Sequence, residues 1–247
     1  MRTVWIAVLL LTGLISPRTS HASTDGLTQV RFVHALGKAG SLDIYVNGAL
    51  VIEGIAAKRV SDYLELVAGP LRFAAVAHGE PLTTKAIQFE AAAHLQLGKT
   101  YTVLMARDET TQMNAPTLLA DDNTWPDIDH VRLRVVNVNV RHAVDVINAG
   151  GDRLAKAVAY RAASAYVEMS STAFAPQIAL SQSGQLLFQV AQEKLMVGTV
   201  YTLFIFDAQD ASFAGSGLFV GLSIDAQLPL LPVTGEDLTQ QCSHYEN

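Results

Sequence analysis

The chain has 247 residues, with 17 basic and 23 acidic side chains and a formal net charge of −6. Charged residues make up 16% of it, against roughly 25% in typical soluble proteins. No basic stripe with interleaved aromatic residues occurs, which argues against a nucleic-acid partner. A weakly charged surface of this kind suits a protein of the cell envelope or the extracellular space.

The first residues predict a secretory signal peptide. Arg2 gives a positively charged start, Val4 to Ile15 form an apolar run, and Ser20-His21-Ala22 supplies the small residues of a cleavage site. The run is shorter than the roughly 20 residues that span a bilayer, so we expect cleavage after Ala22 rather than an anchor. The protein is therefore expected to be exported, to the periplasm or beyond, and no later segment reads as a transmembrane helix.

Cleavage would leave 225 residues and remove Arg2 and Arg18, so that 15 basic residues face 23 acidic ones, a formal charge of −8. Cys242 is the single cysteine, which excludes a disulfide within the chain. An intermolecular disulfide and an unpaired thiol are both open.

An internal repeat organises the chain. Four pairs of segments recur in the same order, at offsets of 103, 102, 103 and 100 residues: 30–34 with 133–137, 42–44 with 144–146, 61–66 with 164–169, and 97–102 with 197–202. A repeat of this length is a duplicated domain rather than a solenoid unit.

Each repeat predicts short strands, because runs rich in Val, Leu, Ile, Tyr and Thr are broken by turn residues about every 8–12 positions. We expect an all-β protein with two tandem Ig-like, Greek-key β-sandwich domains after the cleaved signal peptide at 1–22. The first repeat is placed at 23–123, a linker at 124–130 within the Pro- and Asp-rich stretch, the second repeat at 131–229, and a polar, disordered tail at 230–247.

Two local devices support this fold. Asn47-Gly48 between two apolar runs predicts a hairpin with a type I′ turn. Leu95-x-x-Gly98-x-x-Tyr101 and Leu195-x-x-Gly198-x-x-Tyr201 both look like a tyrosine corner, in which the tyrosine hydroxyl bonds to the backbone a few residues upstream.

With the repeat in view, the chain resembles the domain-of-unknown-function 4397 family of bacterial secreted proteins. The matching stretches are Val30 to Ala35, Leu42 to Gly48, Val60 to Leu66 with Ala68-Gly69, Leu97 to Val103 and Leu119 to Asn123. The second repeat is more divergent, with Asn137 in place of His34. The resemblance implies a β-sandwich and an exported location, and it implies no reaction and no functional residues.

The linker region offers a candidate calcium site. Asp121, Asp122, Asn123, Asp127 and Asp129 place five oxygen-bearing side chains within nine residues, and Ca²⁺ takes 6–8 oxygen ligands. The spacing matches no EF-hand loop, and acidic residues also favour any solvated turn. A solvated linker without metal is therefore the alternative, and no other cofactor is expected.

Other polar residues predict structure rather than chemistry. His34 ends a predicted strand, where a hydrogen-bonded structural histidine is expected, and Asn137 would take the same role. Arg31 with Asp43, and Arg134 with Asp145, suggest one salt bridge across strands in each repeat. We assign no catalytic and no cofactor-binding residues, since no Gly-x-Ser-x-Gly elbow or His-Glu-x-x-His motif occurs.

Three functions stay open at this stage. The first is a non-enzymatic exported protein that binds a protein or an envelope polymer through a sandwich face, an edge strand or loops. The second is a secreted hydrolase or carbohydrate-binding module with a site built from loops. The third is a structural spacer, and the sequence leaves the oligomeric state undetermined.

Overall fold

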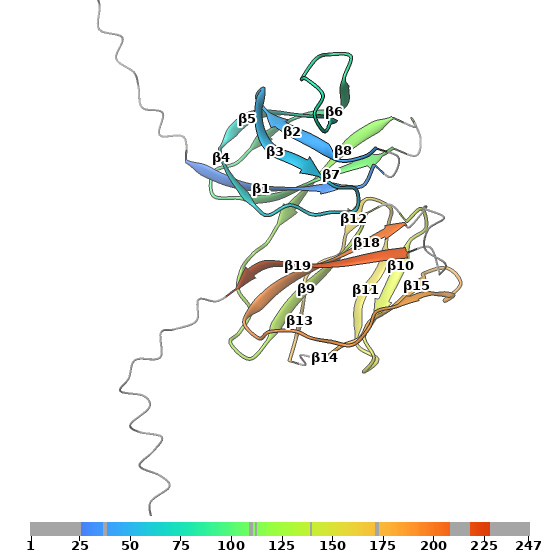
Figure 1. Cartoon of the computed structure of the whole chain (residues 1–247). Helices are drawn as coiled ribbons and strands as arrows, with labels where there is room; N and C mark the ends of the chain where they lie inside the picture. The colour runs from blue at the N-terminus through green and yellow to red at the C-terminus, as the bar shows by residue number, and fades with distance from the viewer. Residues whose placement is uncertain are drawn as a thin grey trace, which may run out of the picture.

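A computed structural model describes residues 26–36, 39–108, 111, 113–138, 140–170, 173–207 and 218–227 of the chain. Its regular elements are all β-strands, and none of the described residues form a helix long and apolar enough to cross a membrane. The expected all-β fold of two tandem β-sandwiches is confirmed (Figure 1). The signal peptide at 1–22, Cys242 and the tail at 230–247 lie outside the described residues.

The first sandwich has two sheets of four strands each. The first sheet has the order β4-β1-β7-β8 and the second the order β3-β2-β5-β6. The strands are β1 (Leu27–His34), β2 (Leu42–Val46), β3 (Ala49–Ile55), β4 (Leu64–Val67), β5 (Gly69–Ala77), β6 (Ile87–Leu95), β7 (Thr100–Arg107) and β8 (Asn114–Asp121). Strands β1 and β7 are parallel, and every other pair in these two sheets is antiparallel.

The second sandwich repeats this topology. One sheet has the order β12-β9-β18-β19, with β13 also paired to β9, and the other has the order β11-β10-β15-β16. The strands are β9 (Val131–Asn137), β10 (Val144–Ile147), β11 (Arg153–Val158), β12 (Ala162–Ala163), β13 (Val167–Met169), β14 (Ala173–Phe174), β15 (Gln177–Leu180), β16 (Leu186–Gln189), β17 (Glu193–Lys194), β18 (Thr199–Asp207) and β19 (Leu218–Gln227). Strands β14 and β17 form a separate pair, and β9 and β18 are parallel, as β1 and β7 are. The exact residues at which the sequence places the domain boundaries stay predictions.

Three apolar clusters hold the molecule together. Each sandwich has its own core, built around Phe32 and Phe73 in the first and around Leu133 and Phe174 in the second. A third cluster joins them, with Val33, Ala35, Leu104 and Ala106 from the first sandwich and Val136, Val138, Phe204 and Phe206 from the second. Strands β1, β7, β9 and β18 are therefore buried on both faces.

The two sandwiches thus pack sheet against sheet (Figure 1). We call this contact the seam: it lies between the sheet of β1, β7 and β8 and the sheet of β9, β18 and β19. In the view of Figure 1 the first described residues of β1 and the last of β19 lie on the same side of the molecule. The connection from β8 to β9 runs along that side as well.

Both predicted local devices are confirmed. Asn47 and Gly48 have φ angles of 49° and 84°, and they join β2 to β3 as a type I′ turn requires. The hydroxyl of Tyr101 accepts a hydrogen bond from the Gln96 amide at 3.3 Å, and that of Tyr201 accepts one from the Met196 amide at 3.0 Å. Gly98 and Gly198 both have φ of 68°, a conformation that glycine adopts without strain.

Candidate functional site

A cluster of buried charged side chains lies in the seam. Arg31 on β1 and Arg134 on β9 have side chains that are 1% and 2% exposed. The Nη1 of Arg31 donates to Oδ1 of Asp225 on β19 at 2.5 Å, and Arg134 donates to Asp121 on β8. Each sandwich therefore supplies one arginine and one aspartate, and each arginine pairs with the aspartate of the other sandwich.

The ion pairs cross the seam in a symmetric way. Arg134 follows Arg31 by 103 residues, and Asp225 follows Asp121 by 104, so the exchanged partners occupy corresponding places in the two repeats. Arg31 also lies 3.7 Å from Asp121 of its own sandwich, which joins both pairs into one network. The seam is thus an approximate two-fold contact between two copies of one domain type.

Hydroxyl groups complete the hydrogen bonding of the network. The Nε of Arg31 donates to Thr102 at 2.9 Å, and the Nε of Arg134 donates to Thr202 at 3.0 Å. The Thr102 hydroxyl in turn donates to Asp121 at 2.6 Å, and the Thr202 hydroxyl donates to Asp225. These threonines are corresponding residues of β7 and β18, at an offset of 100.

Two tyrosines cover the guanidinium groups. The Arg31 guanidinium lies 4.6 Å from the ring centre of Tyr63, and that of Arg134 lies 5.0 Å from the ring centre of Tyr166. The Tyr63 hydroxyl donates to Asp121 at 2.6 Å, and the Tyr166 hydroxyl lies 3.5 Å from Asp225. Cation–π contact and hydrogen bonding therefore come from the same ring on each side.

The burial of the network decides its protonation states. Burial lowers the pKa of Arg31, but the Asp225 carboxylate beside it outweighs this and raises the pKa above its ordinary value. Burial also raises the pKa of the Tyr63 and Tyr166 hydroxyls. Arg31 is thus charged and both tyrosines are neutral near pH 7, which is the arrangement that stabilises the seam.

A second polar contact lies at the other end of the seam. Arg161, between β11 and β12, donates from Nε to Thr117 at 2.9 Å and from Nη1 to Asp108 at 3.2 Å. Its Nη2 donates to the carbonyl groups of Ala115 and Pro116 on β8 at 3.1 and 2.8 Å. Backbone groups of the first sandwich are therefore held by a side chain of the second.

The predicted pairing of Arg31 with Asp43, and of Arg134 with Asp145, is wrong. Both aspartates instead hold an irregularity in the neighbouring strand, where the register shifts next to them. Asp43 accepts from the Gly54 amide at 2.7 Å, and Asp145 accepts from the Ala157 amide at 2.7 Å. The arginines point to the seam face of their sheets, which explains why their partners come from the other sandwich.

The two aspartates differ in the side chain that contacts them. His78 lies against Asp43, with its Nδ1 at 2.8 Å from Oδ1, whereas Asp145 accepts from the Ser181 hydroxyl at 2.6 Å. Burial opposes ionisation of Asp43, but hydrogen bonds from Gly79, His78 and Gly54 outweigh it and lower the pKa of its carboxyl group. The carboxylate has a structural role in each repeat.

His34 and Asn137 hold corresponding loops, as predicted. The buried His34 ring accepts from the Leu36 amide through Nδ1 at 3.2 Å and bonds through Nε2 to the Gly40 carbonyl at 2.8 Å, which requires the neutral ring protonated on Nε2. Asn137 accepts from the Val140 amide at 3.0 Å and donates to three carbonyl groups. Burial lowers the pKa of His34.

The predicted calcium ligands are spread along the linker end of the seam. Asp121 belongs to the buried network, whereas Asp122 pairs with Arg132 at 2.5 Å and Asp129 contacts His130 at 2.7 Å. Asn123 donates to the Asp225 carbonyl at 3.3 Å, and its Oδ1 is buried without a hydrogen-bond partner in the structure.

These contacts bear on the calcium hypothesis without deciding it. Within the described ranges no group of three or more His, Cys, Asp or Glu side chains is arranged to hold a metal ion. The structure places Asp127 in the turn before His130, whose amide donates to the Asp127 carbonyl at 2.9 Å. The calcium site over Asp121, Asp122, Asn123, Asp127 and Asp129 stays a prediction.

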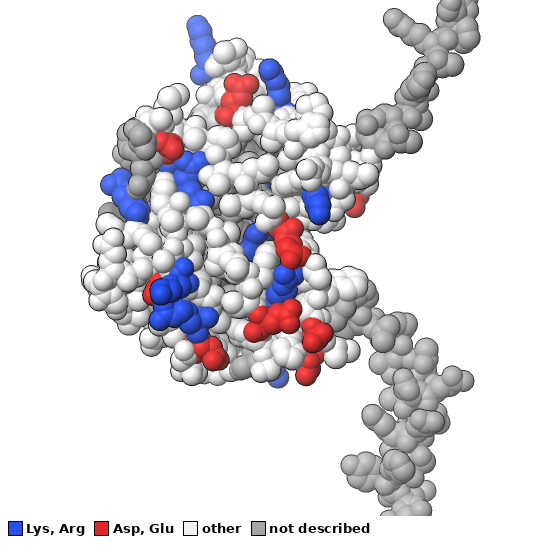
Figure 2. All heavy atoms as spheres, turned by 180° about the vertical axis from the view of Figure 1, so that it is seen from behind, with Lys and Arg blue, Asp and Glu red and all other residues white. Residues whose placement is uncertain are grey.

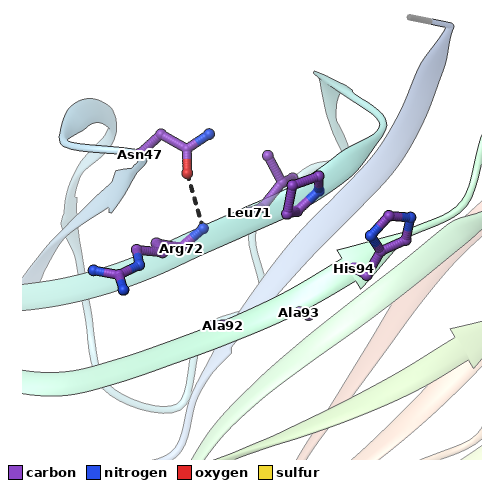
Figure 3. Close-up of a pocket in the computed structure, with 7 residues that line it drawn as sticks. Asn47, Leu71, Arg72, Ala92, Ala93 and His94 are labelled. Atoms are coloured by element: carbon purple, nitrogen blue, oxygen red, sulfur yellow. Dashed lines mark hydrogen bonds between the residues drawn. The ribbon is translucent and has the colours of Figure 1, made fainter.

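An open hollow lies on the outer face of the first sandwich (Figure 3). It is lined by side chains of β5 and β6 and by the turn that joins β2 to β3: Asn47, Pro70, Leu71, Arg72, Ala92, Ala93 and His94. The Asn47 side chain is already bonded, since its Oδ1 accepts from the Arg72 amide at 2.9 Å. The hollow combines small apolar side chains with two basic ones, Arg72 and His94, and it shows no nucleophile beside a base.

The outer surface carries few charges on the face shown in Figure 2. Most of that face is uncharged, and basic and acidic side chains lie next to one another near the waist between the two sandwiches. The weakly charged surface expected from the composition is therefore visible on this face.

Comparison with known proteins agrees with the first half of the fold. The family model for a "Domain of unknown function (DUF4397)" matches residues 28–146, which reach from the start of β1 through the linker and β9 into β10. Residues 28–146 therefore match the DUF4397 family. The resemblance proposed from the sequence is thereby confirmed, and no curated protein matches the chain.

Solved structures give only distant similarities. A candidate cell adhesion protein from Parabacteroides distasonis is 8% identical, with 82% of this chain and 100% of that chain covered and a TM-score of 0.24. The fimbrial anchor protein Mfa2 from Porphyromonas gingivalis is 10% identical, with 81% and 97% covered and a TM-score of 0.24. A candidate cell adhesion protein from Bacteroides fragilis is 9% identical, with 83% and 99% covered and a TM-score of 0.18.

Sequence reasoning missed the two aspartates of the seam as partners of the arginines. From the sequence, Asp121 is a candidate calcium ligand and Asp225 is not singled out. A signal was present, because Leu118-x-x-Asp121 and Leu222-x-x-Asp225 recur at an offset of 104. This short repeated pattern marks the two aspartates as corresponding residues of the two repeats.

Proposed function

We propose that the protein is an exported, non-enzymatic structural or binding protein of the cell envelope or extracellular space, whose two sandwiches act as one rigid body. The observation that carries this is the use of its buried polar groups. Arg31, Arg134, Asp121 and Asp225 bond to one another across the seam, whereas His34 holds a loop. Side chains that could perform chemistry are thus engaged in holding the fold.

Rigidity follows from the composition of the seam. Relative motion of two domains is the ordinary expectation unless their interface is large and apolar. Here a buried apolar cluster lies beside two ion pairs, and separation of the sandwiches would expose that apolar surface to water. A relative shift that left one of these charges buried without its partner would cost about 3–5 kcal/mol, so the ion pairs fix the register of the joined state.

Spin labels on the two sandwiches test the rigidity. In a Cys242→Ser background, Leu50→Cys on β3 and Leu186→Cys on β16 place labels on exposed positions, 48% and 53% accessible. With the labelled chain diluted in an excess of unlabelled Cys242→Ser protein, so that only distances within one chain are recorded, we expect one narrow distance distribution by pulsed electron paramagnetic resonance. Asp225→Asn in the same background serves as the control that broadens it, and a broad distribution in the parent protein would refute the rigid body.

Export rests on the apolar N-terminal run and is tested separately. The full chain, expressed in a bacterium with a C-terminal tag, is expected in the periplasm or the medium. Its mass should be that of a chain that starts at Ser23. A chain that keeps Met1 and stays in the cytoplasm would contradict the export part of the proposal. Replacing Leu9 and Leu10 with Arg interrupts the apolar run and gives the matched control, which is expected to stay inside the cell.

A further inference from the structure

Strand β19 presents a long apolar edge. It is the last strand of its sheet, and β18 is the one strand to which it is hydrogen-bonded within the described residues. From Leu218 to Ile224 it contains no charged residue and no proline. Leu222 and Ile224 are 39% and 49% exposed. An edge of this kind is a template for pairing with a strand of another chain.

The side chains of β19 divide into two sets. Ser223 and Asp225 face the seam, where they bond to Arg31 at 3.0 and 2.5 Å. Leu222 and Ile224 alternate with them and therefore point to the opposite face of the sheet. Pairing along the free edge would use the backbone and the exposed leucine and isoleucine, and it would leave the seam intact.

The corresponding edge of the first sandwich is blocked. Strand β8 has Pro116 where β19 has Val220, and proline has no amide hydrogen to donate. Arg161 also donates to the carbonyl groups of Ala115 and Pro116. The two repeats therefore differ at the very position that decides whether an edge can accept a strand.

We propose that β19 pairs in antiparallel fashion with β19 of a second copy of this chain, giving a two-fold symmetric dimer. With Leu222 on the two-fold axis, Val220 of one copy lies opposite Ile224 of the other, and Gly221 lies opposite Ser223. The strand is thus complementary to itself, since apolar side chains meet apolar ones and small ones meet small ones.

The distribution of charge along β19 also favours a second copy of this chain as its partner. The first charged residue of β19 is Asp225, which would lie opposite Phe219 and is neutralised by Arg31 in its own chain. No like charges are opposed in this register, whereas a partner strand with charges along its length would bury them against Leu222 and Ile224. The inference rests on the proposed function only in that it names the partner of a rigid, non-enzymatic body.

Crosslinking through a single cysteine tests the register. In the mature chain, residues 23–247 with Cys242→Ser, Leu222→Cys would face its own copy across the axis. Directly opposed residues of antiparallel strands have Cα atoms about 4.5–5.5 Å apart, within the range of about 4.4–6.8 Å that a disulfide spans. Mild oxidation is expected to convert this variant to a covalent dimer on a non-reducing gel.

The first repeat supplies the matched control. Leu118 of β8 corresponds to Leu222, since their partners Val103 and Leu203 are equivalent residues of β7 and β18, and it is 40% exposed. Leu118→Cys in the same background is expected to stay monomeric on oxidation. Equal crosslinking of both cysteine variants would overturn the proposal.

Light scattering after size exclusion gives the second readout. The unaltered mature chain is expected to be a dimer, Leu222→Lys a monomer because two ammonium groups would oppose each other, and Leu118→Lys a dimer. A parent chain that is monomeric at every concentration refutes the dimer, as does a Leu222→Lys chain that stays dimeric. Circular dichroism shows that each variant is folded. The outcome of these experiments does not affect the tests of export and of rigidity within one chain.

Discussion

Removing one carboxylate from the seam should weaken the whole molecule. In Asp225→Asn the Arg31 guanidinium, whose side chain is 1% exposed, keeps only Asp121 at 3.7 Å as a charged neighbour. Removing one member of a buried ion pair costs about 3–5 kcal/mol. For a chain of this size each kcal/mol lowers Tm by roughly 2–4 °C, so we expect Tm to fall by about 6–20 °C.

Two further variants make that expectation specific. Asp122→Asn removes a surface carboxylate that is 55% exposed and pairs with Arg132, and it should cost only about 0–1 kcal/mol. Arg31→Met combined with Asp225→Asn removes both charges of one pair and leaves Arg134 with Asp121. The double variant should therefore lose less stability than the sum of its two single variants.

Urea and thermal denaturation, followed by circular dichroism, provide the free energies of unfolding. A coupling between positions 31 and 225 of about 0.5–3 kcal/mol is expected for residues in one network. The parent chain should unfold in one transition, because the apolar cluster of the seam couples the sandwiches. Additive losses, or a Tm for Asp225→Asn equal to that of Asp122→Asn, would refute the reasoning.

Three other predictions concern devices within the sandwiches. Tyr101→Phe and Tyr201→Phe should each cost about 1–3 kcal/mol in urea denaturation, because each leaves a backbone amide without its acceptor. His34→Asn should flatten the pH dependence of stability. Burial lowers the pKa of folded His34, so the unfolded chain binds the extra proton and the parent loses stability as pH falls below about 6.5. The difference in Tm between parent and variant, taken at pH 7.5 and at pH 5.5, measures this loss. Gly54 and Ala157 have φ of 66° and 49°, so Gly54→Ala should destabilise and Ala157→Gly stabilise the protein, each by about 1 kcal/mol, and an equal sign for both in calorimetry would contradict this.

The parts of the fold that depend on local sequence could be predicted. A turn such as Asn47-Gly48 is decided by the φ angles that two adjacent residues tolerate. The tyrosine corner needs only Tyr101 and the five residues before it. The repeat extended the tyrosine corner to Tyr201 in the second half of the chain.

The seam could not be predicted in the same way, because its pairs are distant in the sequence. Arg31 and Asp225 are 194 residues apart, whereas Asp43 lies close by in the next strand and was the natural choice. One signal was available: Thr202 to Phe206 is an almost continuous apolar run. Such a run is typical of a strand buried on both faces, and the outer face of β18 then needs another sheet to cover it.

The calcium hypothesis rests on five oxygen-bearing side chains that lie close together in the sequence, and it stays a prediction. Neighbouring side chains of a strand alternate between the interior and the solvent, so the surroundings of such residues differ. Asp121 ends β8 with its side chain in the seam, and Asp122 turns outward to Arg132. Adjacent carboxylates were therefore divided between two arginines, which depends on where the sheet ends rather than on how many aspartates are present.

The symmetry of the seam also bears on which surface is left for a second molecule. Arg31 and Asp121 lie on one face of the first sandwich, so that face would be complementary to itself in another copy. The connection from residue 122 to 130 holds the two repeats of one chain together, at an effective concentration on the order of millimolar for a short linker. The second sandwich of the same chain therefore occupies the seam before another molecule can. An association between chains has to use a surface on which the two repeats differ, and the edges of β8 and β19 are such surfaces.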